Sequence, residues 1–368
     1  MSVAVLGSGA GALAVAADLA RAGRDPVLAD LPAFAANLAP VRARGGVTMM
    51  LGWDGPQVAP VRVADDLAAA LRGADLAILV VPCFGHAPFL EALAPLLHDG
   101  QTLLFFGEGS GTLTARRALR AAGKRGLRLA ETNTLPYAAR VAGPGAVSAE
   151  RKSGGVLLAA LPTSDTDGVL ALVQDVWPYL APAESVWETV LVNYNAMDHV
   201  PTVIANAGAL ENRTGGMLLW GEGATPSVVR VIEAVDGEIL ALRAALGLRD
   251  RRRYRDFLIA QGFAPPSDDR LYAVMQASRL MAARVAAGPG ALGTRYLTED
   301  VPYALRLIAS IGDAVGVATP VIDGLIALAA ALLGRDLRRE GRTLADFGLA
   351  GLDAAGLRRF AATGEGAA

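Results

Sequence analysis

Two patterns of apolar positions divide the chain into halves. In the first half, short runs of apolar residues alternate with stretches in which apolar residues recur at helical spacing. The short runs predict strands at 3–6, 26–30, 76–81 and 102–106, and the intervening stretches predict helices at 11–22, 86–97 and 111–122. Strands that alternate with helices are typical of βαβ units and of a parallel sheet buried on both faces. Two later runs, at 144–148 and 155–161, are expected to complete this sheet.

The pattern changes near Trp187, beyond which helical spacing takes over. Thr225-Pro226 and Thr319-Pro320 each place an N-cap residue before a proline, whose missing N–H is no loss in a first helical turn. Helices are expected near 188–213, 226–247, 268–287, 299–316 and 320–334. We therefore predict a doubly wound, mainly parallel α/β domain over residues 1–185 and an all-α domain over residues 186–368.

The composition agrees with two globular domains and narrows their functions. The 368 residues are 53% hydrophobic and 19% charged, which provides enough apolar material for sizeable cores. Lys+Arg 34 against Asp+Glu 36 leaves a net charge of −2, too little to hold nucleic acid or an acidic membrane surface. The single cysteine excludes an intrachain disulfide, and no metal site is expected.

The chain carries no pattern of a membrane or secreted protein. Its apolar runs are shorter than the roughly 18 residues of a membrane span, and its first residues lack the basic start of a signal peptide. We therefore expect a cytoplasmic protein. Its Ala- and Leu-rich helical half could supply the surface of a homodimer.

A glycine-rich turn follows the first predicted strand and opens the first predicted helix. Gly7, Gly9 and Ala12 occupy the three positions of the G-x-G-x-x-G/A fingerprint, in which the residues permit a tight turn, approach of the backbone to a pyrophosphate, and close helix–sheet packing. Asp30 ends the second strand, where a carboxylate accepts from ribose hydroxyls and repels a 2′-phosphate. The pattern predicts a Rossmann domain, favours NAD(H) and leaves NADP(H) open. The turn residues predicted to contact the cofactor are Gly7, Ser8, Gly9, Ala10, Gly11 and Ala12.

One of the three histidines stands in a polar stripe. Asn195, His199 and Asn206 share one face of an otherwise mainly apolar predicted helix. A dehydrogenase needs a proton donor beside the carbon that receives hydride, and an imidazole suits that task at neutral pH. The alternative is a histidine that is simply hydrogen-bonded at an interface. The asparagine neighbours and the shortage of other imidazoles favour a catalytic role for His199 and a substrate contact for Asn195.

The segment 294–303 adds two candidates. Asp300 could fix the tautomer of a catalytic histidine, or could only complement the dipole of the helix that it begins. Arg295 has the planar fork that suits a substrate carboxylate. Spacing alone does not choose between these roles.

Taken together and in order, the motifs resemble those of the opine dehydrogenase family, also called the octopine/nopaline dehydrogenase family. The resemblance covers nearly the whole chain, and the combination of motifs is specific. The similar segments are GSGAGALAVAADLARAG at the start, GHAPFLEALAPLLHDGQTLL at 85–104, ETNTLPYAAR at 131–140, NYNAMDH and P-x-x-x-x-N-A-G within 193–208, WGEGATPSVVRVIEAVDGE at 220–238, RYLTEDVPYALRLIASIGDAVGVATPVID at 295–323 and GRTLADFGL at 341–349.

The resemblance implies a Rossmann domain joined to a helical substrate domain, with the active site in the cleft between them. It implies reductive condensation of an amino acid with an α-keto acid to an N-(carboxyalkyl) amino acid (an opine), or the reverse oxidation. His199 and Asp300 stand at the positions that handle protons in such enzymes, and Arg295 stands at the position that holds a carboxylate. The implied partners are these small molecules.

Other residues at matching positions are weaker candidates. Arg140 and Thr134 would contact the substrate. Pro82, His86 and Gly107 follow predicted strands, at the sheet edge where cofactors bind, and would contact the cofactor.

Two other functions fit parts of the sequence. A ketopantoate-reductase-like enzyme or a 2-hydroxy-acid dehydrogenase, which reduces C=O, would share the architecture. A lysine-centred site of that kind is disfavoured, because Lys124 and Lys152 both lie in the first half. The second alternative is a non-catalytic redox sensor that binds the dinucleotide, and an imidazole facing the nicotinamide argues against it.

Overall fold

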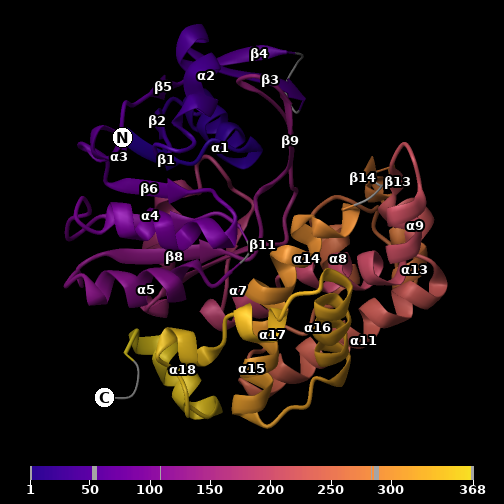
Figure 1. The fold of residues 1–368 in the computed structure, drawn as a ribbon. Coiled ribbons are helices and arrows are strands. Elements are labelled where there is room, and N and C mark those ends of the chain that lie inside the picture. The colour runs from indigo at the N-terminus through magenta and orange to yellow at the C-terminus, as the bar shows by residue number, and fades with distance from the viewer. Residues whose placement is uncertain (1, 52–55, 108, 283, 286–289, 366–368) are drawn as a thin grey trace. The chain divides into compact units, whose positions relative to one another are not determined.

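The computed structural model describes residues 2–51, 56–107, 109–282, 284–285 and 290–365 (Figure 1). The chain forms two compact units. The first unit comprises Met1–Lys152 and Val156–Thr189, and the helical unit comprises Ser153–Gly155 and Val190–Ala368.

The main sheet of the first unit has eight strands. They are β1 (Ser2–Leu6), β2 (Asp25–Ala29), β5 (Arg62–Val63), β6 (Leu76–Leu79), β7 (Thr102–Phe105), β8 (Arg128–Thr132), β11 (Val156–Leu161) and β12 (Leu180–Pro182). Their order is β12-β11-β8-β7-β6-β1-β2-β5, and every neighbouring pair is parallel except β8 with β11. The predicted doubly wound, mainly parallel sheet is confirmed.

Both faces of this sheet are buried, as its continuous apolar runs predict. Along β1, Val3 and Val5 belong to one core and Ala4 and Leu6 to the other, and all four are fully buried. Successive side chains of a strand point to opposite faces, so each face needs its own layer of helices. The helices of this unit are α1 (Ala10–Arg21), α2 (Ala39–Arg44), α3 (Leu67–Leu71), α4 (His86–Leu93), α5 (Gly111–Ala121), α6 (Thr166–Val173) and α7 (Val186–Leu191), of which the last crosses into the helical unit.

A second sheet of four strands lies outside the sequence prediction. Its strands are β3 (Gly46–Leu51), β4 (Gln57–Pro60), β9 (Tyr137–Gly143) and β10 (Ala146–Arg151), in the order β4-β3-β10-β9. The assignment of 144–148 to the main sheet is wrong, because β10 pairs with β9 and β3 instead. Asp18 of α1 is buried and accepts hydrogen bonds from Tyr137 (2.6 Å) and Arg151 (2.7 Å). This carboxylate ties the second sheet to α1.

The helical unit is built almost entirely of helices, which confirms the prediction of an all-α domain. They are α8 (Tyr194–Ala205), α9 (Ala207–Asn212), α10 (Leu219–Gly223), α11 (Pro226–Ala245), α12 (Tyr254–Ala260), α13 (Leu271–Gln276), α14 (Arg295–Thr298), α15 (Arg306–Val315), α16 (Pro320–Leu333), α17 (Leu337–Glu340) and α18 (Ala354–Thr363). A π-helical turn, η6 (Asp300–Leu305), joins α14 to α15, and a short strand pair is formed by β13 (Met217–Leu218) and β14 (Arg284–Val285). Within the described ranges, no helix is both long and apolar enough to cross a membrane.

Several predicted helices are shorter than expected. The stretch 188–213 is broken between Leu191 and Tyr194 and again at Asn206, whose side-chain amide donates to the carbonyls of Thr202 (2.8 Å) and Gly223 (3.1 Å). The stretch 268–287 holds only α13, a 3₁₀ turn and β14, while its residues 283, 286 and 287 lie outside the described residues. Apolar spacing continues across such breaks, so periodicity alone does not reveal them.

Candidate active site

In the glycine turn of the first unit, Gly7 is crowded by neighbouring atoms, whereas Gly9 has open space beside it. Gly7 has φ +124°, and a Cβ on it would lie 2.6 Å from the carbonyl oxygen of Val80. By contrast, no heavy atom lies within 4 Å of the position that a Cβ would take on Gly9. Gly9 precedes α1 without a side-chain cap, and a helix start of this kind binds anionic groups. The turn therefore fits the pyrophosphate of a dinucleotide.

Two more fingerprint residues support this turn. Ala12 is fully buried in the core under the sheet, as a close helix–sheet contact requires. Gly11 packs against Val80 and Leu135, so that a Cβ on it would come within 2.9 Å of the Val80 side chain.

Asp30 lies beside the glycine turn. Its carboxylate is buried and accepts a hydrogen bond from the N–H of Leu31 (2.7 Å). Burial raises the pKa of Asp30, while hydrogen bonds from the Ser8 hydroxyl and the Leu31 N–H lower it. Asn37 in turn donates to the Ser8 hydroxyl (3.2 Å). The structure thus brings together Ser8 and Asp30, both of which the sequence predicts to contact a cofactor.

The remaining candidates for cofactor contact follow β6 and β7. Pro82 is half-buried, and His86 is the buried first residue of α4, with its ring edge-on to Phe105 at 5.1 Å between centroids. Gly107 has φ +136°, and its N–H donates to the Thr132 hydroxyl (3.4 Å). Their proposed contacts with a cofactor stay predictions.

A buried carboxylate that the sequence analysis missed organises the start of α5. Glu131 is fully buried at the end of β8 and accepts from the N–H groups of Ser110 (3.1 Å) and Thr112 (2.8 Å) and from the hydroxyl of Thr189 (2.6 Å). Burial raises the pKa of Glu131, and these hydrogen bonds lower it. It fixes the segment after Gly107, and a glutamate at a strand end gives no sequence signal for this role.

Two candidate substrate residues of the first unit make contacts within the fold. The Thr134 hydroxyl is buried and accepts from the Lys152 ammonium (2.8 Å). Arg140 is exposed on β9, and its guanidinium donates to the carbonyl of Ala139 (2.9 Å). Their contact with a substrate remains a prediction.

The helical unit brings His199 and Asp300 together. Nδ1 of His199, on α8, lies 2.8 Å from Oδ2 of Asp300, the first residue of η6. The His199 side chain is 16% exposed and that of Asp300 is 3% exposed, so the imidazole can reach a ligand while the carboxylate stays sheltered. The rings of Tyr296 (4.2 Å between centroids) and Trp220 (5.6 Å) pack against the imidazole. This arrangement can store a proton on the imidazole and stabilise its charged form.

The other members of the predicted set differ in surroundings. Asn195 is half-buried one turn before His199, and Arg295 is 67% exposed, with Nη1 at 3.4 Å from Oε2 of the buried Glu299. Asn206 holds backbone carbonyls at the end of α8, which is a structural role. No group of three or more His, Cys, Asp or Glu suited to a metal ion occurs in the part of the chain that the structure describes.

A dinucleotide turn on a doubly wound sheet, together with an imidazole–carboxylate pair in a helical unit, defines a two-unit NAD(P)-dependent oxidoreductase. Along nearly its whole length the chain is similar to the opine dehydrogenase of Arthrobacter sp. (strain 1C), with 33% identity over 360 residues that cover 96% of this chain and 97% of that protein. The chain therefore belongs to the opine dehydrogenase family, whose members act on CH–NH groups.

Further similarities agree with this assignment. Vitopine synthase of Allorhizobium ampelinum is 27% identical over 95% of this chain and 96% of its own. The family model for the α-helical domain of NAD/NADP octopine/nopaline dehydrogenases matches residues 182–333, and that of ketopantoate reductase PanE/ApbA matches residues 3–162. A solved octopine dehydrogenase in complex with NADH and agmatine has a TM-score of 0.83 and 20% identity, over 100% of this chain and 98% of that one, which supports the fold.

Proposed function

We propose that the protein catalyses the NADH-dependent reductive condensation of an amino acid with an α-keto acid, and the reverse oxidation of the resulting opine. The observation that carries this proposal is the 2.8 Å contact between His199 and Asp300 in a chain of the opine dehydrogenase family. Octopine dehydrogenases solved with NADH and either L-arginine or pyruvate support the two substrate classes.

The chemistry follows from the orientation of the imidazole. Asp300 accepts from Nδ1–H of His199, which leaves Nε2 to exchange a proton with the substrate. The amine adds to the keto carbon, and the imidazolium protonates the hydroxyl of the carbinolamine so that water leaves and an iminium forms. Asp300 stabilises the charged imidazole until that proton is transferred. NADH, when bound, supplies the hydride that reduces the iminium carbon.

The remaining candidates take positioning roles in this proposal. Asp30 and the glycine turn would hold the dinucleotide, with NAD(H) favoured because the Asp30 carboxylate repels a 2′-phosphate. Arg295 would hold the keto-acid carboxylate through its planar fork. Asn195, Arg140 and Thr134 would contact the substrate. The cytoplasmic location and the homodimer stay predictions.

An NADH-oxidation screen tests the proposal. Amino acids are crossed with pyruvate, glyoxylate, oxaloacetate and 2-oxoglutarate, and each keto acid is also assayed without an amine. We expect oxidation only when both substrates are present, with a product whose mass is that of the secondary amine. Equal oxidation with a keto acid alone would instead indicate a C=O reductase, and tight NADH binding without turnover of any pair would indicate a redox sensor.

A further inference from the structure

The second ring nitrogen of His199 also faces a carboxylate. Nε2 lies 3.6 Å from Oδ1 of Asp198, the preceding residue of α8, while Nδ1 lies 2.8 Å from Oδ2 of Asp300. The imidazole thus has an acidic side chain beside each nitrogen. Only the Asp300 contact enters the mechanism above, and the contact with Asp198 needs a separate explanation.

Asp198 is held in place from two other helices. Its side chain is buried, and Oδ2 accepts hydrogen bonds from the indole N–H of Trp220 on α10 (3.0 Å) and from the hydroxyl of Tyr254 on α12. Burial raises the pKa of Asp198, whereas the neighbouring His199 and the two donors lower it. The donors occupy Oδ2, so that Oδ1 is the oxygen beside His199.

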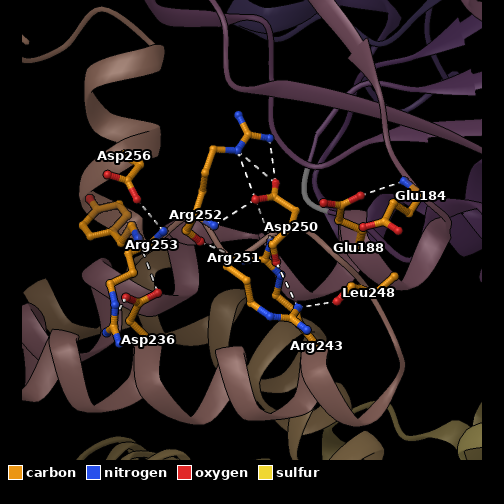
Figure 2. Close-up of polar contacts among 11 residues, drawn as sticks. Glu184, Glu188, Asp236, Arg243, Leu248, Asp250, Arg251, Arg252, Arg253 and Asp256 are labelled. Atoms are coloured by element: carbon orange, nitrogen blue, oxygen red, sulfur yellow. Dashed lines mark hydrogen bonds and ion pairs between the residues drawn. The ribbon is translucent and has the colours of Figure 1, made fainter.

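The position of Tyr254 is itself fixed by buried charges of α11. The N–H of Tyr254 donates to Asp236 (3.3 Å), and Asp236 lies 3.5 Å from the Arg253 guanidinium. Arg243 is fully buried, donates to the carbonyl of Arg252 (2.9 Å) and lies 3.3 Å from Asp250. Figure 2 shows these side chains around residues 248–253. The segment that precedes α12 is therefore anchored, and with it the phenol that holds Asp198.

We propose that Asp198 is a positioning residue that keeps His199 doubly protonated before substrates bind, so that Nε2 carries the proton needed to expel water from the carbinolamine; this rests on the proposed function. A neutral imidazole with its proton on Nδ1 would leave the Nε2 lone pair 3.6 Å from the carboxylate oxygen Oδ1. A second proton turns that repulsion into attraction. Burial makes it costly to keep the Asp198 carboxylate charged. The hydrogen bonds from Trp220 and Tyr254 offset this cost.

Several other ionisable groups near α8 have described partners of their own. Tyr296 of α14 offers an aromatic face, and Asp300 occupies the other nitrogen. On four of the elements packed against α8, ion pairs join Glu222 of α10 to Arg213, Asp236 of α11 to Arg253, Arg295 of α14 to Glu299, and Asp323 of α16 to Arg338, while Glu238 of α11 accepts from the N–H groups of Val321 and Ile322.

Titration of the histidines by NMR tests the proposal directly. The chain has three imidazoles, and the His199→Gln variant assigns the signal of His199. In Asp198→Asn, we expect the pH at which His199 loses its proton to fall by about one unit. The titration curves of His86 and His98 should not change. Glu222→Gln, which removes an exposed carboxylate of α10, serves as the matched control and should change none of the three. An unchanged His199 titration in a folded Asp198→Asn protein would overturn the proposal.

A second pair of variants covers the case in which Asp198→Asn does not fold. Tyr254→Phe removes one hydrogen-bond donor to Asp198. It should lower the pH at which His199 loses its proton, but by less than Asp198→Asn does. Tyr194→Phe is its control, because Tyr194 is a buried tyrosine of α8 whose hydroxyl has no hydrogen-bond partner among the described residues. Equal titration of His199 in both variants would contradict the proposal.

Activity gives an independent comparison. With any substrate pair found in the screen, kcat/KM is measured against pH. In Asp198→Asn, the fall of kcat/KM at high pH should shift to lower pH by the same number of pH units as the NMR titration of His199. A shifted titration without this shift in kcat/KM would remove Asp198 from the reaction. Should no pair oxidise NADH, the proposed function fails, and the NMR titration still decides how Asp198 acts on His199.

Discussion

The proton chemistry proposed for His199 depends on residues that lie far apart along the chain. His199 and Asp300 were accessible from the sequence because each stands in a motif of the family, although they are 101 positions apart. A role for Asp198 was not, although the motif NYNAMDH includes it, since neighbouring residues of a helix point about 100° apart and periodicity assigns them to different faces. Its partners Trp220 and Tyr254, 22 and 56 positions away, are visible only in the folded chain.

The first prediction concerns the imidazole itself. His199→Ala should lower the turnover of NADH oxidation by about 100-fold or more, because a positioned general acid contributes roughly that factor. His98→Ala is the matched control, since His98 lies in an exposed turn where its Nδ1 contacts the carbonyl of Asp99 (3.0 Å). Circular dichroism should show both variants folded. Wild-type turnover in His199→Ala would place the acid elsewhere.

At the scale of elements, the sequence predicted a helix or strand best where the apolar pattern of that segment alone determines it. Five strands of the main sheet, β1, β2, β6, β7 and β11, were found because each is a continuous apolar run, whereas β5, β8 and β12 were not predicted. The second sheet was missed because a run identifies a strand but not its partner, and β4 buries only Ala59 along its length. The breaks in the first predicted helix of the helical unit depend on tertiary hydrogen bonds such as those of Asn206.

The turn between β1 and α1 gives the second prediction. Gly7→Ala should destabilise the protein by several kcal/mol and abolish NADH binding, because the new methyl group meets the Val80 carbonyl and φ is positive. Gly23→Ala, after α1, also has positive φ but open space around it, and should lose only about 1 kcal/mol and retain binding. Urea unfolding and NADH fluorescence titration measure both. Equal losses in the two variants would contradict the steric argument.

The anchoring of α12 by α11 gives a pH-dependent prediction. Burial raises the pKa of Asp236 from 3.8 to about 6, although the nearby Arg253 opposes the shift. Between these values the folded chain holds the proton more tightly than the unfolded chain, so this group makes the free energy of unfolding fall as pH rises from about 4 to about 6.

Asp236→Asn removes that contribution. Relative to the parent protein, its free energy of unfolding should therefore gain about 2 kcal/mol between pH 4 and pH 6, since one pKa unit corresponds to 1.36 kcal/mol and part of the shift is released outside this interval. Denaturant unfolding at both pH values measures the difference. Asp65→Asn, at a carboxylate that is 87% exposed, is the control and should follow the parent. Parallel pH profiles for Asp236→Asn and the parent would show that Asp236 titrates alike in both states.

At the scale of the whole molecule, the change of pattern near Trp187 predicted two parts of different architecture. The structure divides the chain between Thr189 and Val190 and also assigns Ser153–Gly155 to the helical unit. A segment of three residues is too short to show a periodicity, so no sequence pattern could reveal that Ser153–Gly155 belongs to the helical unit. Which unit binds which ligand stays a prediction.

The choice of cofactor is a property of the complete enzyme and gives the last prediction. Asp30→Ala should lower the ratio of kcat/KM with NADH to that with NADPH on the order of 10-fold, because it removes the carboxylate that we propose accepts from ribose and repels a 2′-phosphate. Asp25→Ala is the control, because Asp25 is an exposed carboxylate at the start of β2, the strand that Asp30 follows, and it pairs with Arg62. Steady-state assays with both cofactors measure the ratio. An unchanged or larger preference for NADH would assign discrimination to other residues.

The assignment of Ser153–Gly155 to the helical unit constrains how chimeras of this enzyme and its relatives can be built. The N–H of Ser153 donates to the carbonyl of Gln261 (3.2 Å), whereas the N–H of Lys152 donates to that of Pro136 (3.0 Å). A chimera with a single junction near residue 186 would graft the helical part of one parent onto a tripeptide from the other. Exchanging both segments, with junctions on either side of 153–155 and a third at 189/190, keeps each set of native neighbours together.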